Sequence, residues 1–120
     1  MSDTDPKAIA TKCLASWSKG DLATTRSLLD DSVTFVGPLG ATEGADAYIE
    51  GVKRLAQIVK EIDQHEVFGE GEDVCVIYDL VTASPQATIP TAGWYKVRGG
   101  RIVSVQAFFD ARPLVPAPAR

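Results

Sequence analysis

The sequence has few of the side chains that metal and redox sites require. Its 120 residues include one histidine and two cysteines. Cys13 and Cys75 are far apart in the chain, so no pair of Cys or His ligands has the spacing of a zinc site. Both cysteines fall on segments expected to be buried, which favours free thiols in a reducing compartment, although the sequence alone leaves a disulfide open. We expect no metal and no cofactor.

Clusters of basic residues and long apolar runs are also absent. No cluster of Lys or Arg occurs and the net charge is −4, so the surface repels both nucleic-acid phosphates and anionic membranes. No apolar run approaches the roughly 20 residues of a membrane-spanning helix. The acidic N-terminus MSDTDPKAIA lacks the apolar segment of a signal peptide. We therefore expect a cytoplasmic protein without nucleic-acid or membrane partners.

The composition and the length of the chain fit one domain. The chain is 45% hydrophobic and 23% charged, which is typical of a globular protein, and its length suffices for one core but not for two. We expect a single domain over residues 1–120. Its last segment, 111–120, is rich in proline, which cannot continue a strand ladder.

Helical signals dominate the first half of the chain. Asp5 and Pro6 form a good helix start, with a capping residue before a proline at the first helical position. Ile9, Cys13, Leu14 and Trp17 then recur at helical spacing, up to Gly20. The pattern predicts a second short helix over 22–30 and a third over 45–59.

Strand signals dominate the second half. Only one strand is expected earlier, at 32–37, before a loop rich in turn residues. Later runs of β-branched and aromatic residues predict antiparallel strands at 61–69, 74–83, 91–97 and 101–110, with a loop over 84–90. Gly99-Gly100 joins the last two strands in a hairpin pattern. This order predicts an α+β fold in which the helices cover one face of a sheet.

Four short segments carry a family resemblance. They are WSKGD at 17–21, FVGP at 35–38, VCVIYDLVT at 74–82 and GRIVSVQAFFD at 100–110. With the element order, they resemble the SnoaL-like branch of the nuclear-transport-factor-two-like superfamily, over about residues 7–113. This resemblance implies a cone-shaped, strongly curved, mostly antiparallel sheet of the cystatin-like kind, wrapped around helices. It also implies an apolar pocket at the open end and homodimers formed through the sheet.

The catalytic side chains known from relatives of this superfamily are not found at the matching positions. The steroid-isomerase base, tyrosine and protonated aspartate fall at Gly37, near Cys13 and near Gly93. The aspartate of cyclases and epoxide hydrolases falls at Ala107. Epoxide hydrolases also carry an Arg and an Asp on a middle strand, and here the matching positions hold Ile77 and Asp79. One carboxylate of the family set is therefore present without its partners.

Asp79 is the principal catalytic candidate. It shares strand parity with Cys75, Ile77 and Val81, whereas Tyr78 points to the other face. If the Asp79 face lines the cone, burial would raise the carboxyl pKa and make it a general acid or base. The alternative is that Asp79 lies near a strand end, paired with an arginine or hydrogen-bonded to a loop.

Two further polar residues are candidates, each with a structural alternative. His65 is the only imidazole, and with Asp79 it could form an acid–base dyad across the pocket. Alternatively, it is a half-exposed strand residue. Asp110 could lie at the pocket rim, or it could end the last strand and pair with a nearby arginine.

Aromatic residues provide the candidate pocket wall. A subset of them should contact a small hydrophobic molecule, and a tyrosine among them could donate a hydrogen bond to a ligand oxygen. The expected ligand-binding residues are Trp17, Phe35, Tyr48, Ile77, Trp94, Tyr95 and Phe109. Two functions remain open: an acid–base isomerase, cyclase or hydrolase acting on an apolar substrate, and a non-catalytic module that binds a small molecule or forms a dimer.

Overall fold

The computed structural model describes residues 5–83 and 85–114. Three helices precede and interrupt the strands: α1 (Pro6–Ser18), α2 (Leu22–Ser27) and α3 (Ala45–Ala56). Six strands follow the order β1 (Leu29–Gly37), β2 (Gly40–Glu43), β3 (Val59–Glu70), β4 (Asp73–Ala83), β5 (Gln86–Arg98) and β6 (Arg101–Phe109), and a short 3₁₀ helix, η1, covers Arg112–Leu114. The rest of the predicted tail, 115–120, lies outside the described residues.

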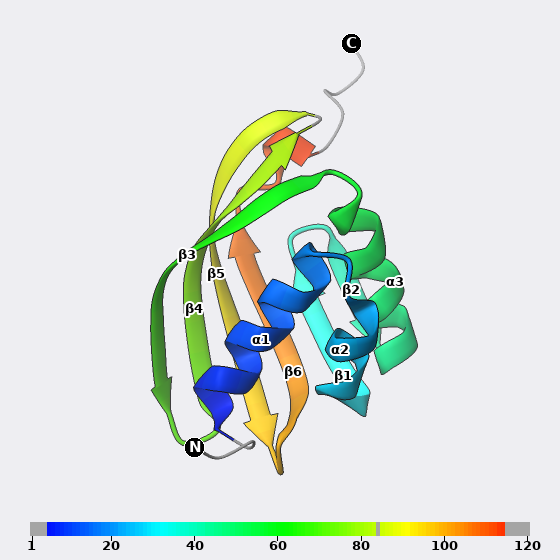
Figure 1. Cartoon of the computed structure of the whole chain (residues 1–120), viewed down its shortest axis with the longest axis vertical. Coiled ribbons are helices and arrows are strands. Elements are labelled where there is room, and N and C mark those ends of the chain that lie inside the picture. The colour runs from blue at the N-terminus through cyan, green and yellow to red at the C-terminus, as the bar shows by residue number, and fades with distance from the viewer. Residues whose placement is uncertain (1–4, 84, 115–120) are drawn as a thin grey trace.

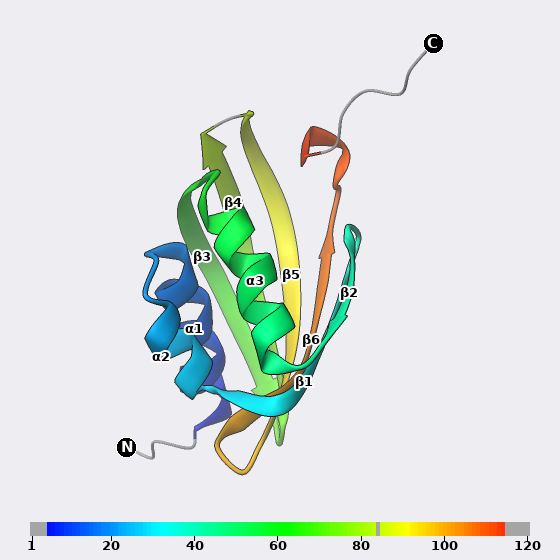
Figure 2. The ribbon, with the colours of Figure 1, turned by 90° about the vertical axis from the view of Figure 1, so that its right-hand side faces the viewer.

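The strands form one mixed sheet, and the helices lie on one of its faces. The sheet order is β2-β1-β6-β5-β4-β3, and only the β1–β6 pair is parallel. Figures 1 and 2 show the sheet curving around α1 and α3, with α2 beside α1. We call the helix-covered face the inner face and the opposite face the outer face. The predicted α+β cone is confirmed.

The core lies between the inner face and the helices. α1 contributes Ile9, Cys13, Leu14 and Trp17, all buried as their helical spacing predicted. The alternate residues of β4, from Val74 to Leu80, pack against them. α2 is fixed by Asp21, whose carboxylate accepts a hydrogen bond from the Thr24 amide, and by a buried 2.6 Å contact between the Ser16 and Thr25 hydroxyls. No helix in the described part of the chain could cross a membrane.

Several predicted boundaries were wrong. The second helix ends at Ser27, and β1 begins at Leu29 rather than 32. The predicted loop after β1 instead contains β2, which pairs with β1 through a tight turn between Gly37 and Gly40. β5 begins at Gln86 and includes Pro90, opposite Asp79. Proline lacks the amide donor for a ladder hydrogen bond, which is why the sequence pattern favoured a loop there.

Candidate functional site

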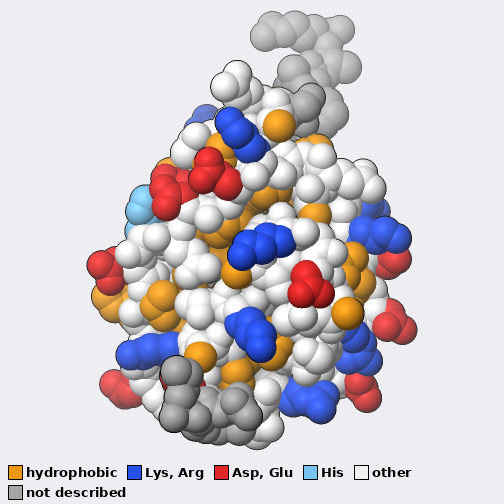
Figure 3. Space-filling model, in the orientation of Figure 1, with side chains coloured by type: hydrophobic (Ala, Val, Ile, Leu, Met, Phe, Trp, Pro, Cys, Tyr) orange, Lys and Arg blue, Asp and Glu red, His pale blue; other side chains and the backbone are white. Residues whose placement is uncertain are grey.

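A cavity of about 550 Å³ lies between α3 and the inner face of the sheet. Its wall includes the β1–β2 turn at Leu39 and Gly40, the last turn of α3, and Leu114 of η1. In Figure 2 these elements lie around the end of the cone toward which β6 runs. Figure 3 shows charged side chains of both signs scattered over the helix-bearing face, with hydrophobic side chains between them. The cavity has the size of a pocket for a small organic molecule.

One stripe of α3 faces this cavity. Ala47, Gly51 and Arg54 follow one another at intervals of three or four residues and all line it, as expected for neighbours on one helix face. An ideal Cβ at Gly51 would meet no atom within 4 Å. Gly51 therefore leaves space that a larger side chain would fill. Arg54 is the one charged residue in the wall, as far as the structure describes the chain.

Three buried tyrosines contribute polar groups to the mostly apolar cavity. Tyr48 comes from α3, Tyr78 from β4 and Tyr95 from β5, and all three line the cavity. Burial raises the pKa of each phenol well above the ordinary value, because the phenolate would lose its hydration. The three hydroxyls are therefore neutral near pH 7 and can donate hydrogen bonds.

The surroundings of Tyr48 hold its ring in place. Its hydroxyl lies 3.9 Å from the Cys13 thiol, and burial raises the pKa of that thiol to about 12. The ring packs edge-on against Phe35, with 5.9 Å between ring centroids. Cys13 is buried among apolar groups as a neutral thiol, and it is a poor nucleophile there.

The structure places five of the seven expected ligand-binding residues in the cavity wall: Trp17, Phe35, Tyr48, Tyr95 and Phe109. Tyr78 and Arg54 also line the cavity but were missed from the sequence. Strand parity assigned Tyr78 to the outer face. Arg54 lies in a polar-looking stretch of α3, and no pattern in the sequence distinguished it from a solvent-exposed arginine.

The expectation that Asp79 and Ile77 face the pocket was wrong. The buried set of β4 is Val74, Val76, Tyr78, Leu80 and Thr82. Asp79 and Ile77 alternate with these residues and therefore lie on the outer face. Both faces of β4 carry bulky apolar side chains, so hydrophobic periodicity did not identify the inner one.

Trp94 is a second correction. Its side chain lies on the outer face at 44% exposure, and its indole N–H donates to Asp73 Oδ1 at 3.0 Å. Its cross-strand neighbours are Cys75 on β4 and Gln106 on β6. Trp94 therefore lies on the outer face of the sheet and not in the cavity wall.

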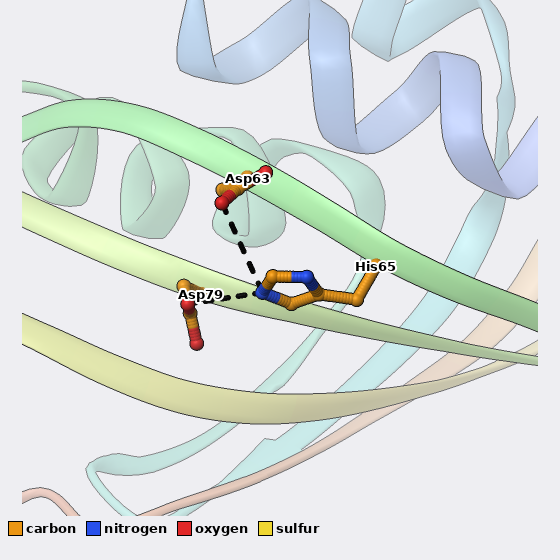
Figure 4. A group of neighbouring side chains, drawn as sticks. All are labelled: Asp63, His65 and Asp79. Atoms are coloured by element: carbon orange, nitrogen blue, oxygen red, sulfur yellow. Dashed lines mark hydrogen bonds and ion pairs between the residues drawn. The ribbon is translucent and has the colours of Figure 1, made fainter.

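The expected His65–Asp79 pair exists, but on the outer face. His65 Nε2 lies 2.9 Å from Asp79 Oδ2, and Asp63 Oδ2 is 3.9 Å from the same nitrogen. Figure 4 shows both carboxylates on the same side of the imidazole, with dashed lines from each to one ring nitrogen. The hydrogen bond to Asp79, with a smaller contribution from the charge of Asp63, raises the pKa of His65. Neither His65 nor Asp79 lines the cavity, so this pair is not the pocket dyad that the sequence suggested.

Asp110 forms an ion pair with Arg112 and does not lie at the cavity rim. Arg112 Nη2 and Nε donate to Asp110 Oδ2 at 2.6 and 2.9 Å, and this pairing lowers the pKa of the carboxyl to about 2. Asp110 is absent from the cavity wall. Asp110 therefore follows the last strand and pairs with a nearby arginine, which was the alternative to a position at the pocket rim.

Positions where the family resemblance would place catalytic groups do border the cavity. Gly37, Gly93 and Ala107 all line it. In this chain they carry no functional side chain. A Cβ on Gly93 would lie 3.0 Å from the Tyr95 ring, so that ring occupies space beside the glycine. Among the described residues, the cavity wall contains no carboxylate and no imidazole.

Comparison with known proteins agrees with this architecture. The family model of the SnoaL-like domain matches residues 10–105. The chain belongs to the SnoaL-like family. No curated protein matches it.

Solved structures share the fold at low sequence identity. An NTF2-like protein of unknown function from Cytophaga hutchinsonii is 29% identical, with a TM-score of 0.80 over 92% of this chain and 94% of that one. A protein from Kribbella flavida has a TM-score of 0.84 at 24% identity, covering 90% and 88%. An LEH-like epoxide hydrolase from M. tuberculosis has a TM-score of 0.77 at 18% identity, covering 88% and 83%. At such identities the last two comparisons show the fold alone.

Proposed function

We propose that this SnoaL-like protein binds a small, mostly apolar molecule that carries at least one oxygen, and that it does so without acid–base catalysis. The observation that carries this proposal is the composition of the cavity wall. About 550 Å³ is enclosed mainly by aliphatic and aromatic side chains, and the polar groups are few. Few, well-placed polar groups in an apolar pocket are typical of small-molecule sites.

The polar groups favour an oxygen-bearing ligand. The neutral hydroxyls of Tyr48, Tyr78 and Tyr95 can donate to a carbonyl, ether or hydroxyl oxygen. Thr42 Oγ1, in the same wall, is buried without a hydrogen-bond partner among the described residues. Arg54 adds a positive charge in the last turn of α3. An acidic group on the ligand would therefore be favoured near Arg54.

Binding is favoured over acid–base chemistry by the same wall. A general base must reach the proton that it abstracts, and Asp79 and His65 are on the other face of the sheet. Of the positions that the resemblance links to catalysis, those that border the cavity hold glycine or alanine, at Gly37, Gly93 and Ala107. The tyrosines can polarise a carbonyl, but their raised pKa values leave almost no phenolate near pH 7, so none of them is available as a general base.

A filled-cavity variant tests the proposal. The probe is 8-anilinonaphthalene-1-sulfonate, an aromatic anion whose fluorescence rises in apolar sites. We expect saturable binding to the native protein and at least about tenfold weaker binding to Gly51→Leu, which corresponds to about 1.4 kcal/mol. Gly51→Ala is the matched control, because it adds only one methyl group at the same position.

A second variant pair separates the cavity from the outer face and tests the role of Arg54. Arg54→Gln should weaken binding of the anionic probe severalfold. It should leave the affinity for the uncharged probe N-phenyl-1-naphthylamine unchanged. Trp94→Lys should leave the affinity for both probes unchanged. Loss of probe binding in Trp94→Lys, with full binding in Gly51→Leu, would show that the probe binds the outer face and would refute the proposal.

We also propose that two copies pair through their outer faces. Cross-strand partners place six residues side by side across β3 to β6: Phe68, Cys75, Ile77, Ala92, Trp94 and Phe108. We call this set the outer patch. Phe68, Trp94 and Phe108 are 44–58% exposed, although large side chains of this kind gain most from burial. A second copy would cover them, as the family resemblance implies.

A further inference from the structure

Asp63 and Asp79 occupy an unfavourable arrangement on the outer face. They are direct cross-strand partners on β3 and β4, and like charges directly opposite each other destabilise a sheet. Their neighbour on β5 is Pro90, opposite Asp79, which brings no charge. A positive group between the two carboxylates would offset their repulsion.

A β-bulge places His65 beside this pair of carboxylates. The β3–β4 register shifts between Gln64 and Glu66, so His65 is the extra residue on β3. Bulges re-aim a side chain relative to a regular strand. Here the imidazole points one ring nitrogen toward both carboxylates, and both dashed contacts in Figure 4 converge on that nitrogen.

The three donor atoms have nearly the spacing of a metal site. His65 Nε2 is 2.9 Å from one oxygen of Asp79 and 3.9 Å from one of Asp63, and all three donors lie within 4.8 Å of one another. A zinc ion held at 2.0–2.2 Å by each donor in tetrahedral geometry needs donors about 3.3–3.6 Å apart. The two contacts lie on either side of this spacing, so small side-chain rotations of Asp79 and of the exposed Asp63 would bring both carboxylates to it.

The geometry points to a divalent transition-metal site made by Asp63, His65 and Asp79. One imidazole and two carboxylates suit a zinc-class ion rather than calcium or magnesium, which prefer all-oxygen ligands. The side chains are 27–58% exposed, so water can complete the coordination. The dication would neutralise the facing carboxylates. The spacing of these residues along the chain does not reveal the site, because strand register and the bulge bring the ligands together.

Proton NMR of the native, untagged chain tests the site directly. The chain has one histidine, so the two imidazole C–H resonances belong to His65 without further assignment. On titration with ZnCl₂ we expect both resonances to shift and to saturate at one equivalent per chain. Resonances that do not move, or that drift without saturation, would overturn the inference.

Isothermal titration calorimetry with ZnCl₂ identifies the ligands. His65→Ala, Asp63→Asn and Asp79→Asn should each weaken binding at least about tenfold, since loss of an outer-shell partner alone often costs this much. Glu70→Gln, at the other end of β3, and Cys75→Ser, on the neighbouring strand, should bind as the native chain does. Unchanged binding in His65→Ala would place the zinc elsewhere and refute the site. Because these residues lie outside the cavity, failure of the pocket proposal would not affect this result.

Discussion

At the scale of single residues, the cavity depends on neutral side chains that burial keeps protonated. The chain has three tyrosines, and all three are buried in the cavity wall. Cys13 lies beside Tyr48, and burial raises its pKa to about 12. These four groups are donors without charge over the whole physiological range. Such groups orient a ligand oxygen without taking part in proton transfer.

Their raised pKa values predict alkaline unfolding. In the unfolded chain, the thiol ionises near pH 8.5 and the phenols near pH 10. In the folded protein these pKa values are higher, so the unfolded state loses its protons first. Stability is therefore full below the unfolded pKa values and falls as the pH rises through them.

Tyrosinate absorbance at 295 nm and far-ultraviolet circular dichroism, recorded together from pH 7 to 12.5, check this prediction. We expect no tyrosinate signal until the protein unfolds, and then a cooperative rise. A gradual rise near pH 10 in a protein that keeps its native circular dichroism would contradict the buried positions of the tyrosines.

At the scale of elements, α3 contains a glycine that enlarges the cavity but lowers the stability of the helix. A glycine in a helix interior costs roughly 0.5–1 kcal/mol relative to alanine, because it has more backbone freedom to lose. Gly51 lies in the interior of α3, where a Cβ would meet no atom within 4 Å. The glycine therefore widens the cavity at the expense of helix stability.

Gly51→Ala should therefore stabilise the protein by about 0.5–1 kcal/mol. Urea denaturation of the native chain and of this variant measures the difference, and the m-value should stay constant because the surface exposed on unfolding barely changes. A lower midpoint for Gly51→Ala would mean that the added methyl group clashes, and that the space beside α3 is not open.

The elements also show how far sequence patterns extend. The cores of α1 and α3 were predictable, because their apolar residues recur at helical spacing and one face of each is polar. β4 was predictable as a strand, but its inner face was not, since Cys75, Ile77 and Val81 are as apolar as Val74, Val76 and Leu80. The outer patch makes both faces of this strand apolar, and Asp79 was assigned to the wrong face for that reason.

Strand register was the other feature that the sequence did not supply. Short β2 is recognisable only from its pairing with β1, and β5 continues through Pro90 because β4 pairs along its length. The meeting of Asp63 with Asp79, and the bulge that brings in His65, depend on the same register. His65 and Asp79 could be proposed as partners from the resemblance, but Asp63 could not.

At the scale of the whole molecule, the two faces of the sheet carry different features. The inner face and the helices enclose the cavity, whereas the outer face carries the outer patch and the proposed metal ligands. Exposed aromatic side chains in one contiguous patch mark interaction surfaces. A dimer through the outer patch would leave the mouth of both cavities open.

The predicted dimer can be tested by sedimentation velocity over a range of protein concentrations. We expect the native chain to be dimeric, and Trp94→Glu and Phe68→Glu to be monomeric, because a buried unpaired carboxylate costs several kilocalories per mole. Leu39→Glu is the control. Leu39 is also an exposed apolar residue, but it lies at the cavity mouth and should leave the dimer intact. A native chain that is monomeric throughout would refute the dimer.

The central claim, that the cavity binds a small apolar molecule, is tested most directly by the two tryptophans. Trp17 lies in the cavity wall and Trp94 on the outer face, and each gives one indole N–H resonance in a ¹H–¹⁵N spectrum. On titration with N-phenyl-1-naphthylamine we predict that the Trp17 resonance shifts and saturates while the Trp94 resonance stays in place. A shift of Trp94 alone, or of neither resonance, would contradict the claim.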